Sequence, residues 1–570
     1  MEIGYNKIVM EQNVGMKTSD GAVLRANVYR PDDNGRHPAI LIREPYSKDL
    51  RPDWGCFSPH FYALAGFAVV LQDVRGTGVS DGHPKMNQGE RLDGCETIQW
   101  VAAQPWCDGQ VSMMGLSYYG STQVQAAQAQ PEHLTALAPF MPMGGHFRAS
   151  LEPGCPKWYY KQIIQAMRQG RFILDAETMR ARIQKMEEIM SHAEYLADLP
   201  EREGRLITGM PEFPEIQKES QARIDHLDDH QFWVDSGWEI DAEKIQVPCL
   251  FGTGWYDGAK QMTLELYQRV TEGGASRKAR ECSRLIIGPW PHGFTFPRIL
   301  QGIDFGQEAA GEVFGMKEKL IDWNRYWSME EDTPYMREAP VQLFLLGANE
   351  WRGYSAWPPN EAESTPYYMV SGGKANTRMG DGRLTAYMED SADTDTYRYD
   401  PMDPTPGSEM VAFIEKNQER EDTLVYTSAP MAEELNVTGV VCVTLYARTS
   451  TKDTDFFCRL SDVDPDGRAM FLTSGMVRAR YRKGYRKPEF LMPGEIYPYE
   501  IPMSGISNLF RKGHCIRVDI VSSSFPEVDR NHNTGDPVGC GTETVVAEQT
   551  IYHSRSYPSH INLPVISEKK

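Results

Sequence analysis

The sequence has no apolar run long enough to cross a membrane. A membrane-spanning helix needs roughly 20 consecutive apolar residues, and although hydrophobic residues make up 41% of the 570-residue chain, polar residues interrupt them throughout. The first residues, Met1–Lys7, also lack the basic stretch and apolar segment of a signal peptide. We therefore expect no membrane partner and a cytoplasmic location.

Positive charge is also scarce. The 59 Lys and Arg residues are outnumbered by 79 Asp and Glu, which gives a net charge of −20 that would repel a phosphate backbone. The short basic run Arg478–Lys483 alternates with other residues, and we interpret it as the solvated face of a strand. We expect no nucleic-acid partner.

Signs of metal or cofactor binding are few. The ten cysteines occur singly, without a Cys-x-x-Cys pair, which indicates reduced, buried thiols. His226 and His230 have a helical spacing that could ligate zinc, but the acidic sequence around them fits an ordinary segment better. Asp462–Gly467 begins like a calcium loop, yet Thr473 stands where a bidentate Glu is required, so a hairpin turn is expected there. The sequence predicts neither a metal nor a cofactor.

The chain is too long for one hydrophobic core, and its pattern changes along its length. Strand and helix signals alternate at first, with strands over 38–42 and 66–72 and a helix over 90–103. A Met-, Lys- and Glu-rich helical region follows, and from about Val341 short alternating strands such as Val341–Leu345 predict a β-sandwich or jelly roll. The expected units are an α/β domain in two parts (1–145 and 243–340), an inserted helical segment (146–242) and a β domain (341–570).

One serine stands on a sharp turn between a strand and a helix. Gln110–Met114 is strand-like, Ser121–Gln130 is helix-like, and Ser117 lies between them in Gly-Leu-Ser-Tyr-Tyr-Gly. This resembles the Gly-x-Ser-x-Gly turn that displays a nucleophile. It departs from the consensus because Tyr119 occupies the second glycine position and the glycine follows at Gly120.

A serine nucleophile needs a base to take its proton and a carboxylate to orient that base. Asp257 follows the apolar run Val247–Gly252, and His292 follows the apolar run Arg284–Gly288. Each has an ordinary alternative, since Asp-Gly is a common turn pair and His292 could be a loop histidine. Together they follow the serine in the order Ser, Asp, His, which is the order in α/β-hydrolases. Because parallel sheets place their sites at the carboxyl ends of strands, we expect a catalytic triad of Ser117, Asp257 and His292.

These motifs, with others along nearly the whole chain, resemble the cocaine esterase-type (CocE/NonD) serine hydrolases, which are related to X-Pro dipeptidyl-peptidases and α-amino acid ester hydrolases. The matching segments outside the serine turn are Asp20–Leu24, Val28–Pro31, Arg43–Tyr46, Asp73–Gly76, Gly254–Gly258, Gly288–His292, Tyr399–Pro401, Asp453–Phe456, Pro465–Gly467, Asp529–Asn531 and Asn533–Gly535.

The resemblance implies an α/β-hydrolase domain with an inserted helical cap and a C-terminal β jelly-roll domain. The family's serine turn also carries Ser-Tyr-x-Gly, which accounts for Tyr119. By the family pattern, the phenol of Tyr46 and the backbone N–H of Tyr118 form the oxyanion hole. The ordinary alternative for Tyr46 is an aromatic side chain packed at a strand end.

The activity expected is hydrolysis of small-molecule carboxylic esters through an acyl-enzyme. In α-amino acid ester hydrolases two carboxylates follow the triad Asp, whereas Gly258, Ala259 and Lys260 follow Asp257 here, which favours neutral acyl groups. The alternatives are a peptidase or amidase, an α-amino acid ester hydrolase acting as an acyltransferase, and a catalytically inert protein that binds through its jelly roll. A homo-oligomer is left open.

Overall fold

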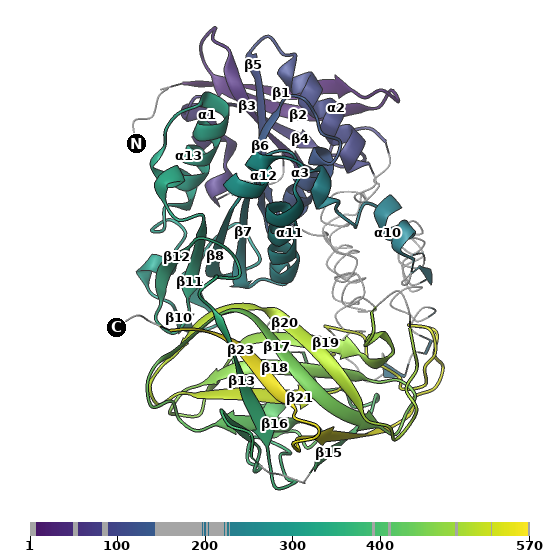
Figure 1. Cartoon of the computed structure of the whole chain (residues 1–570). Helices are drawn as coiled ribbons and strands as arrows, with labels where there is room; N and C mark the ends of the chain where they lie inside the picture. The colour runs from purple at the N-terminus through teal and green to yellow at the C-terminus, as the bar shows by residue number, and fades with distance from the viewer. Residues whose placement is uncertain are drawn as a thin grey trace.

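The first part of the chain forms a ten-stranded sheet with a parallel centre (Figure 1). Its strand order is β1-β2-β4-β3-β5-β6-β7-β8-β11-β12. Neighbours from β4 to β11 pair in parallel, whereas β1–β2, β2–β4 and β11–β12 are antiparallel. The strands are β1 (Ile8–Lys17), β2 (Val23–Pro31), β3 (His37–Glu44), β4 (Ala68–Asp73), β5 (Cys107–Leu116), β6 (Leu134–Phe140), β7 (Leu250–Tyr256), β8 (Arg284–Pro291), β11 (Val341–Leu345) and β12 (Glu350–Tyr354).

The structure is a computed structural model. It describes residues 7–49, 55–82, 89–142, 196–197, 199–200, 203, 222, 225–226, 229–389, 394–407, 412–484, 488–525 and 527–567. The predicted helical segment, 146–242, lies outside the described residues except for short pieces and 229–242. That last piece contains the helix α10 (His230–Asp235).

Helices cover both faces of this sheet, which is why every residue of β3 and β4 is buried. Successive strand residues point to opposite faces. Leu41 packs in one cluster with Val124 of α3, and Ile40 packs in the other with Leu320 of α13. The helices are α1 (Pro59–Leu64), α2 (Glu90–Ala102), α3 (Tyr118–Ala127), α11 (Lys260–Gly273), α12 (Arg277–Cys282) and α13 (Met316–Met329).

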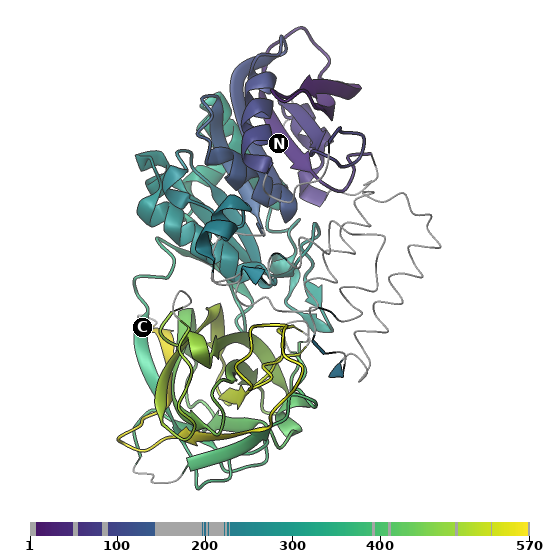
Figure 2. The ribbon, with the colours of Figure 1, turned by 90° about the vertical axis from the view of Figure 1, so that its right-hand side faces the viewer.

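The second part of the chain is β-rich. Its eleven-stranded sheet has the order β15-β22-β17-β23-β13-β14-β16-β21-β18-β19, with β20 paired to β17, and Figure 2 shows it curled around its own core. All of its strand pairs are antiparallel except β14–β16. The strands are β13 (Glu363–Val370), β14 (Arg383–Thr385), β15 (Thr394–Tyr399), β16 (Leu424–Ser428), β17 (Leu435–Thr449), β18 (Asp455–Val463), β19 (Ala469–Arg478), β20 (Tyr497–Phe510), β21 (Cys515–Val521), β22 (Ala547–Tyr552) and β23 (His560–Ile566). The short β9 (Ile299–Leu300) and β10 (Ile303–Asp304) pair separately.

Val341–Leu345 forms a strand, as expected, but it pairs within the first sheet and not with the strands of the second. This segment is β11, and it pairs in parallel with β8 of the first sheet. A buried parallel strand and a sandwich-core strand are both short apolar runs, so the pattern could not distinguish them. The chain just after β11 also contacts the second sheet, since Leu346 N–H donates to the Ser507 carbonyl at 2.9 Å. The strand therefore joins the two sheets at their boundary.

The interpretation of Arg478–Lys483 as a solvated strand face is wrong at its first arginines. Arg478 pairs with Asp455 at 2.9 Å and Arg480 pairs with Asp453 at 2.8 Å, and both carboxylates are buried. The amide of Asn531 donates to both of these carboxylates at 2.8 Å. The acidic partners lie far from these arginines in the sequence, so the local alternation of basic and other residues could not predict the ion pairs.

The predicted helix and the predicted hairpin turn are confirmed. The helix predicted over 90–103 is α2, and the acidic turn joins β18 to β19, where Asp464 Oδ1 accepts the N–H of Arg468 at 3.0 Å. The nine cysteines within the described residues are free thiols, of which Cys249 is buried and Cys442 half-buried. In that same part of the chain no helix is long and apolar enough to span a membrane.

Candidate active site

Ser117 occupies a strained position between the last residue of β5 and the first residue of α3. Its φ of 64° and ψ of −123° lie outside the regions that L-residues ordinarily adopt. The Ser117 N–H donates to the Phe140 carbonyl at 2.8 Å, which holds the turn against the neighbouring strand β6. A strained strand-to-helix turn of this kind exposes a serine hydroxyl above the sheet.

Glycines on each side make the turn possible. A Cβ at Gly115 would lie 2.5 Å from the Cβ of Tyr119, and a Cβ at Gly120 would lie 2.7 Å from the Phe140 carbonyl oxygen. The close approach of α3 to β6 therefore occurs at position 120, one residue later than in the consensus turn. This explains how a tyrosine can occupy position 119.

The structure brings Ser117, His292 and Asp257 together in one hydrogen-bonded line. His292 Nε2 lies 2.9 Å from Ser117 Oγ, and His292 Nδ1 lies 2.8 Å from Asp257 Oδ1. When Nδ1–H donates to the carboxylate, the lone pair of Nε2 faces the serine hydroxyl. The three residues come from the ends of β5, β7 and β8, so the parallel sheet aligns them.

Asp257 is held by its own loop. Its other carboxylate oxygen, Oδ2, accepts the hydroxyl of Thr253 at 2.9 Å, and Oδ1 also accepts the N–H of Ala259 at 2.9 Å. The Asp257 side chain is fully buried, whereas 40% of the His292 side chain is exposed. The carboxylate is thus fixed inside the protein, and the imidazole can be reached from solvent. The roles of Thr253 and Ala259 were not foreseen from the sequence.

Tyr46 lies beside the same turn. Its N–H donates to Glu44 Oε2 at 2.9 Å, and its ring packs edge-on against Tyr119, with 5.4 Å between ring centroids. Tyr118 is the first residue of α3, and the first N–H groups of a helix point out of its N-terminal end. The Tyr118 phenol donates to Glu90 Oε1 at 3.1 Å. The buried Glu90 also pairs with Arg43, and burial raises its pKa despite that guanidinium.

Aromatic rings adjoin the triad. Phe294, two residues after His292, lies 5.6 Å from Tyr119 and 6.3 Å from Phe57, measured between ring centroids. The sequence pattern does not reveal this group, because its members come from three separate segments. Together with Tyr46, these rings give the region near the serine an apolar, aromatic side.

No group of three or more metal-ligating side chains is found among the residues that the structure describes. Within them, His226 Nδ1 lies 3.1 Å from Asp229 in an exposed pair. The groups gathered at Ser117 are a hydroxyl, an imidazole and a carboxylate, the three kinds of group that enzymes of acyl transfer combine.

Both parts of the chain match sequence models of known protein families. Residues 20–294 match the sequence model of the X-Pro dipeptidyl-peptidase (S15) family, and residues 334–562 match that of the X-Pro dipeptidyl-peptidase C-terminal non-catalytic domain. The chain is 32% identical to cocaine esterase from Rhodococcus sp. (strain MB1 Bresler), over 97% of this chain and 98% of that protein.

Two solved structures share the fold over nearly the whole chain. An aminopeptidase from the marine sediment archaeon Thaumarchaeota archaeon superimposes with a TM-score of 0.79 at 23% identity, covering 99% of this chain and 97% of that one. An α-amino acid ester hydrolase superimposes with a TM-score of 0.73 at 21% identity, covering 99% and 98%. The chain therefore belongs to the cocaine esterase-type (CocE/NonD) family of serine hydrolases, and its two parts match the X-Pro dipeptidyl-peptidase models.

Proposed function

We propose that this chain hydrolyses small-molecule carboxylic esters through an acyl-enzyme on Ser117. The observation that carries the proposal is the hydrogen-bonded line from Ser117 through His292 to the buried Asp257. The likeness to cocaine esterase supports an ester as the substrate.

The reaction follows from the positions of these groups. His292 Nε2 takes the hydroxyl proton while Ser117 Oγ bonds to the ester carbonyl carbon, and the carbonyl oxygen becomes negative. Asp257 stabilises the imidazolium that forms. The imidazolium then gives its proton to the departing alkoxide as the carbon–oxygen bond breaks, which leaves the acyl group on Ser117. A water molecule, deprotonated by His292, hydrolyses the acyl-enzyme and restores the serine.

The Tyr46 phenol and the Tyr118 N–H are the oxyanion donors in this proposal. The packing of Tyr46 against Tyr119 supports it, because Tyr119 is only two positions after Ser117 in the chain. The position of Tyr118 at the start of α3 supports it as well, since helix N-termini favour negative charge. Loss of one such donor typically costs about 10²–10³-fold in turnover.

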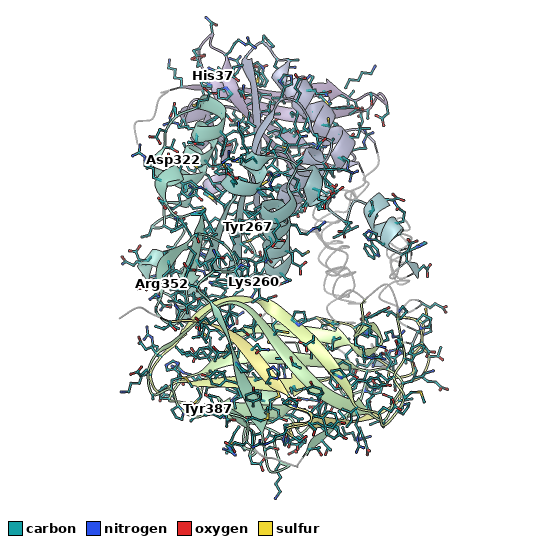
Figure 3. All side chains as sticks on the ribbon, viewed as in Figure 1. His37, Lys260, Tyr267, Asp322, Arg352 and Tyr387 are labelled. Carbon is teal, nitrogen blue, oxygen red and sulfur yellow. The ribbon has the colours of Figure 1, made fainter. Side chains whose placement is uncertain are left out.

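We further propose that the acyl group is neutral, that the second sheet is a jelly roll, and that residues 146–242 form a helical cap. Ala259 and Lys260 follow the Asp257 loop, and both are buried, so no carboxylate stands next to the triad acid there. Figure 3 shows Lys260 at the side of the first unit that faces the second sheet. A site for an α-ammonium group would need carboxylates from elsewhere.

The second candidate is a peptidase or amidase of the same family. The match to the X-Pro dipeptidyl-peptidase models favours it, because the same triad can cleave an amide when His292 protonates the leaving amine. Matched p-nitrophenyl esters and p-nitroanilides of the same acyl groups, with and without an α-amino group, decide between the two. Faster anilide than ester cleavage would favour the peptidase.

The first experiment treats the protein with a fluorophosphonate and measures the intact mass, for the wild type and for Ser117→Ala. We expect one adduct, mapped to Ser117 and absent from the variant, and a fall in kcat of about 10⁶-fold. Because Ser117 sits on a turn at the edge of the core, the variant should keep the wild-type circular dichroism spectrum. Ester hydrolysis at the wild-type rate by Ser117→Ala would contradict the proposal.

A further inference from the structure

Two carboxylates lie side by side beneath the turn that carries Tyr46. Glu44 ends β3 and Asp73 ends β4, and these two residues are partners in the parallel register of the strands. Both are fully buried. The triad does not use either of them, and buried carboxylates are rare unless hydrogen bonds or ion pairs compensate them.

Each carboxylate holds one side of the turn. Glu44 Oε2 accepts the N–H of Tyr46 at 2.9 Å, and Asp73 Oδ1 accepts the N–H of Lys48 at 2.7 Å. Between them Ser47 has a φ of 72°, in the left-handed region that non-glycine residues rarely adopt. A conformation of this kind persists only where surrounding contacts impose it. The two bonds on either side of Ser47 are such contacts.

The Lys48 side chain adds an ion pair to the contact between Asp73 and the turn. It is fully buried, and its ammonium lies 2.5 Å from Asp49 and 3.5 Å from Asp73. Asp49 in turn accepts the amide of Asn27, on β2, at 2.9 Å. A buried ammonium paired with two carboxylates is held in place, because moving it would take the ammonium away from the buried Asp73 carboxylate.

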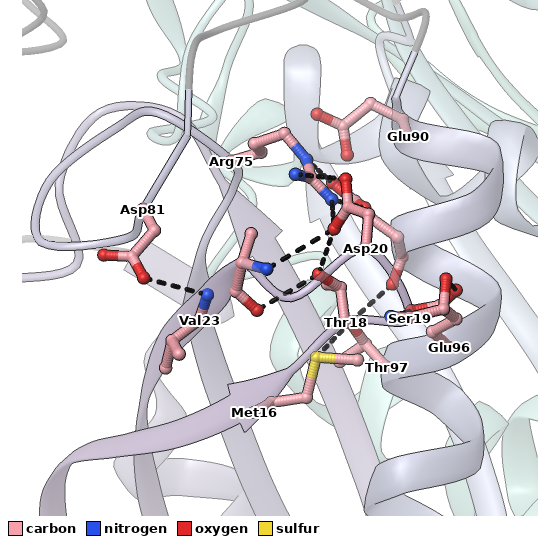
Figure 4. A network of polar contacts seen from close by, with 12 residues as sticks. Met16, Thr18, Ser19, Asp20, Val23, Arg75, Asp81, Glu90, Glu96 and Thr97 are labelled. Carbon is pink, nitrogen blue, oxygen red and sulfur yellow. Dashed lines mark hydrogen bonds and ion pairs between the residues drawn. The ribbon is translucent and has the colours of Figure 1, made fainter.

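The loop after β4 is shaped around Asp73. The N–H of Val79 donates to Asp73 Oδ2 at 3.1 Å, and a Cβ at Gly78 would lie only 2.2 Å from that oxygen. The outer side of this loop is held separately, by Arg75 between Asp20 and Asp93 and by Asp81 on the N–H of Val23 (Figure 4). The loop therefore contacts the Tyr46 turn through Asp73, and its other contacts go to β2, α2 and the turn before β2.

We propose that Asp73 and Lys48 are positioning residues that clamp the Tyr46 turn and so hold the phenol where the oxyanion forms. This inference rests on the proposed function, since it needs Tyr46 to be an oxyanion donor. Errors of about 1 Å in the position of a catalytic group cost roughly 10²-fold in rate. The clamp acts on the transition state, so its loss lowers kcat and leaves KM nearly unchanged.

The test compares Asp73→Asn with Asp81→Asn, which alters a carboxylate of the same loop that also accepts a backbone N–H, but that of Val23 on β2 and not one of the Tyr46 turn. With a p-nitrophenyl ester, we expect Asp73→Asn to lower kcat about 10²-fold with KM within about threefold of the wild type. Asp81→Asn should keep kcat within about twofold. Equal kcat values for the two folded variants would overturn the clamp.

A double variant separates positioning from a general loss of structure. If Asp73 acts through Tyr46, then Asp73→Asn costs less than about threefold in a Tyr46→Phe background, because coupled residues are not additive. If Asp73→Asn lowered kcat by the same factor in the wild-type and the Tyr46→Phe backgrounds, the proposal would be overturned. Wild-type turnover by Tyr46→Phe itself would instead contradict the oxyanion role of Tyr46, which is part of the proposed function.

If Asp73→Asn does not fold, Lys48→Met is the variant that tests the proposal. This variant keeps the hydrogen bond from the backbone N–H of residue 48 to Asp73. It removes only the ammonium group, because the Met side chain has a similar length. We expect a fall in kcat of about tenfold with little change in KM, again smaller in the Tyr46→Phe background. Unchanged kcat in a folded Lys48→Met protein would overturn the role of the lysine in the clamp.

Discussion

At the scale of single residues, His514 makes the stability of the second sheet depend on pH. His514 Nδ1 lies 2.8 Å from Asp462 Oδ1, and Asp462 Oδ2 also accepts the amide of Asn508. The hydrogen bond to Asp462 raises the pKa of His514 above its usual 6.5, helped by the charge of Asp464 and opposed by partial burial and by Arg511.

A raised pKa in the folded state means that the folded protein holds this proton more tightly than the unfolded chain does. The stabilisation is fully present below pH 6.5 and is lost as pH rises through the folded-state pKa. We therefore expect His514→Asn to lower the free energy of unfolding at pH 6 by a few tenths to about 1 kcal/mol, since the pair is partly exposed to solvent. The difference from the wild type should shrink towards pH 9.

Urea unfolding of both proteins at the two pH values measures this. Asn at position 514 can still hydrogen-bond to Asp462, so the comparison isolates the charge. If the difference in free energy of unfolding between the two proteins grew with rising pH, the ion pair would not stabilise the fold.

At the scale of elements, the sequence could single out Ser117, Asp257 and His292, which the folded chain brings into contact, because each directly follows a buried parallel strand. The runs before Ser117, Asp257 and His292 became β5, β7 and β8. The supports of the site were not predictable in this way. Lys48 contacts Asp73 across 25 positions, and Arg480 contacts Asp453 across 27, so only the folded chain brings these charges together. For the same reason, the local pattern of Val341–Leu345 could not identify β8 as the partner strand of β11.

The close pairing of β7 and β8 aligns two members of the triad. A Cβ at Gly254 would lie 1.9 Å from the Trp290 carbonyl oxygen, and this contact occurs three residues before Asp257 and two before His292. Gly254→Ala must therefore separate the strand ends. We expect a lower unfolding midpoint and a fall in kcat/KM of about 10²-fold, because the carboxylate and imidazole move apart.

Ester hydrolysis and thermal melting of the purified variant check this expectation. The matched control is Gly273→Ala at the end of α11, where the added Cβ would approach Glu243 Cγ only to 3.6 Å, an ordinary contact. If both alanine variants kept wild-type kcat/KM, the alignment of the strand ends would not matter for the site.

At the scale of the whole molecule, Trp357 joins the two sheets. It follows β12 of the first sheet and is 4% exposed, and its ring centroid lies 6.1 Å from that of Trp255 on β7. On the other side it fills the space at Gly505 of β20, where a Cβ would lie 2.3 Å from the Trp357 ring. Since Trp255 is two residues before Asp257, the packing between the sheets extends to the strand that carries the triad acid.

This contact predicts that the second sheet stabilises the active site. We expect Trp357→Ala to lose about 3–5 kcal/mol of stability, as is typical for truncating a buried aromatic side chain. Activity should be lost at a lower urea concentration than in the wild type. Tyr387→Ala is the control, because Tyr387 is an aromatic residue of the second part that is 84% exposed (Figure 3). Circular dichroism and ester hydrolysis across a urea series measure both quantities. If Trp357→Ala matched Tyr387→Ala in each, the two sheets would be stable independently of this contact, and the C-terminal sheet would have no structural role in the triad.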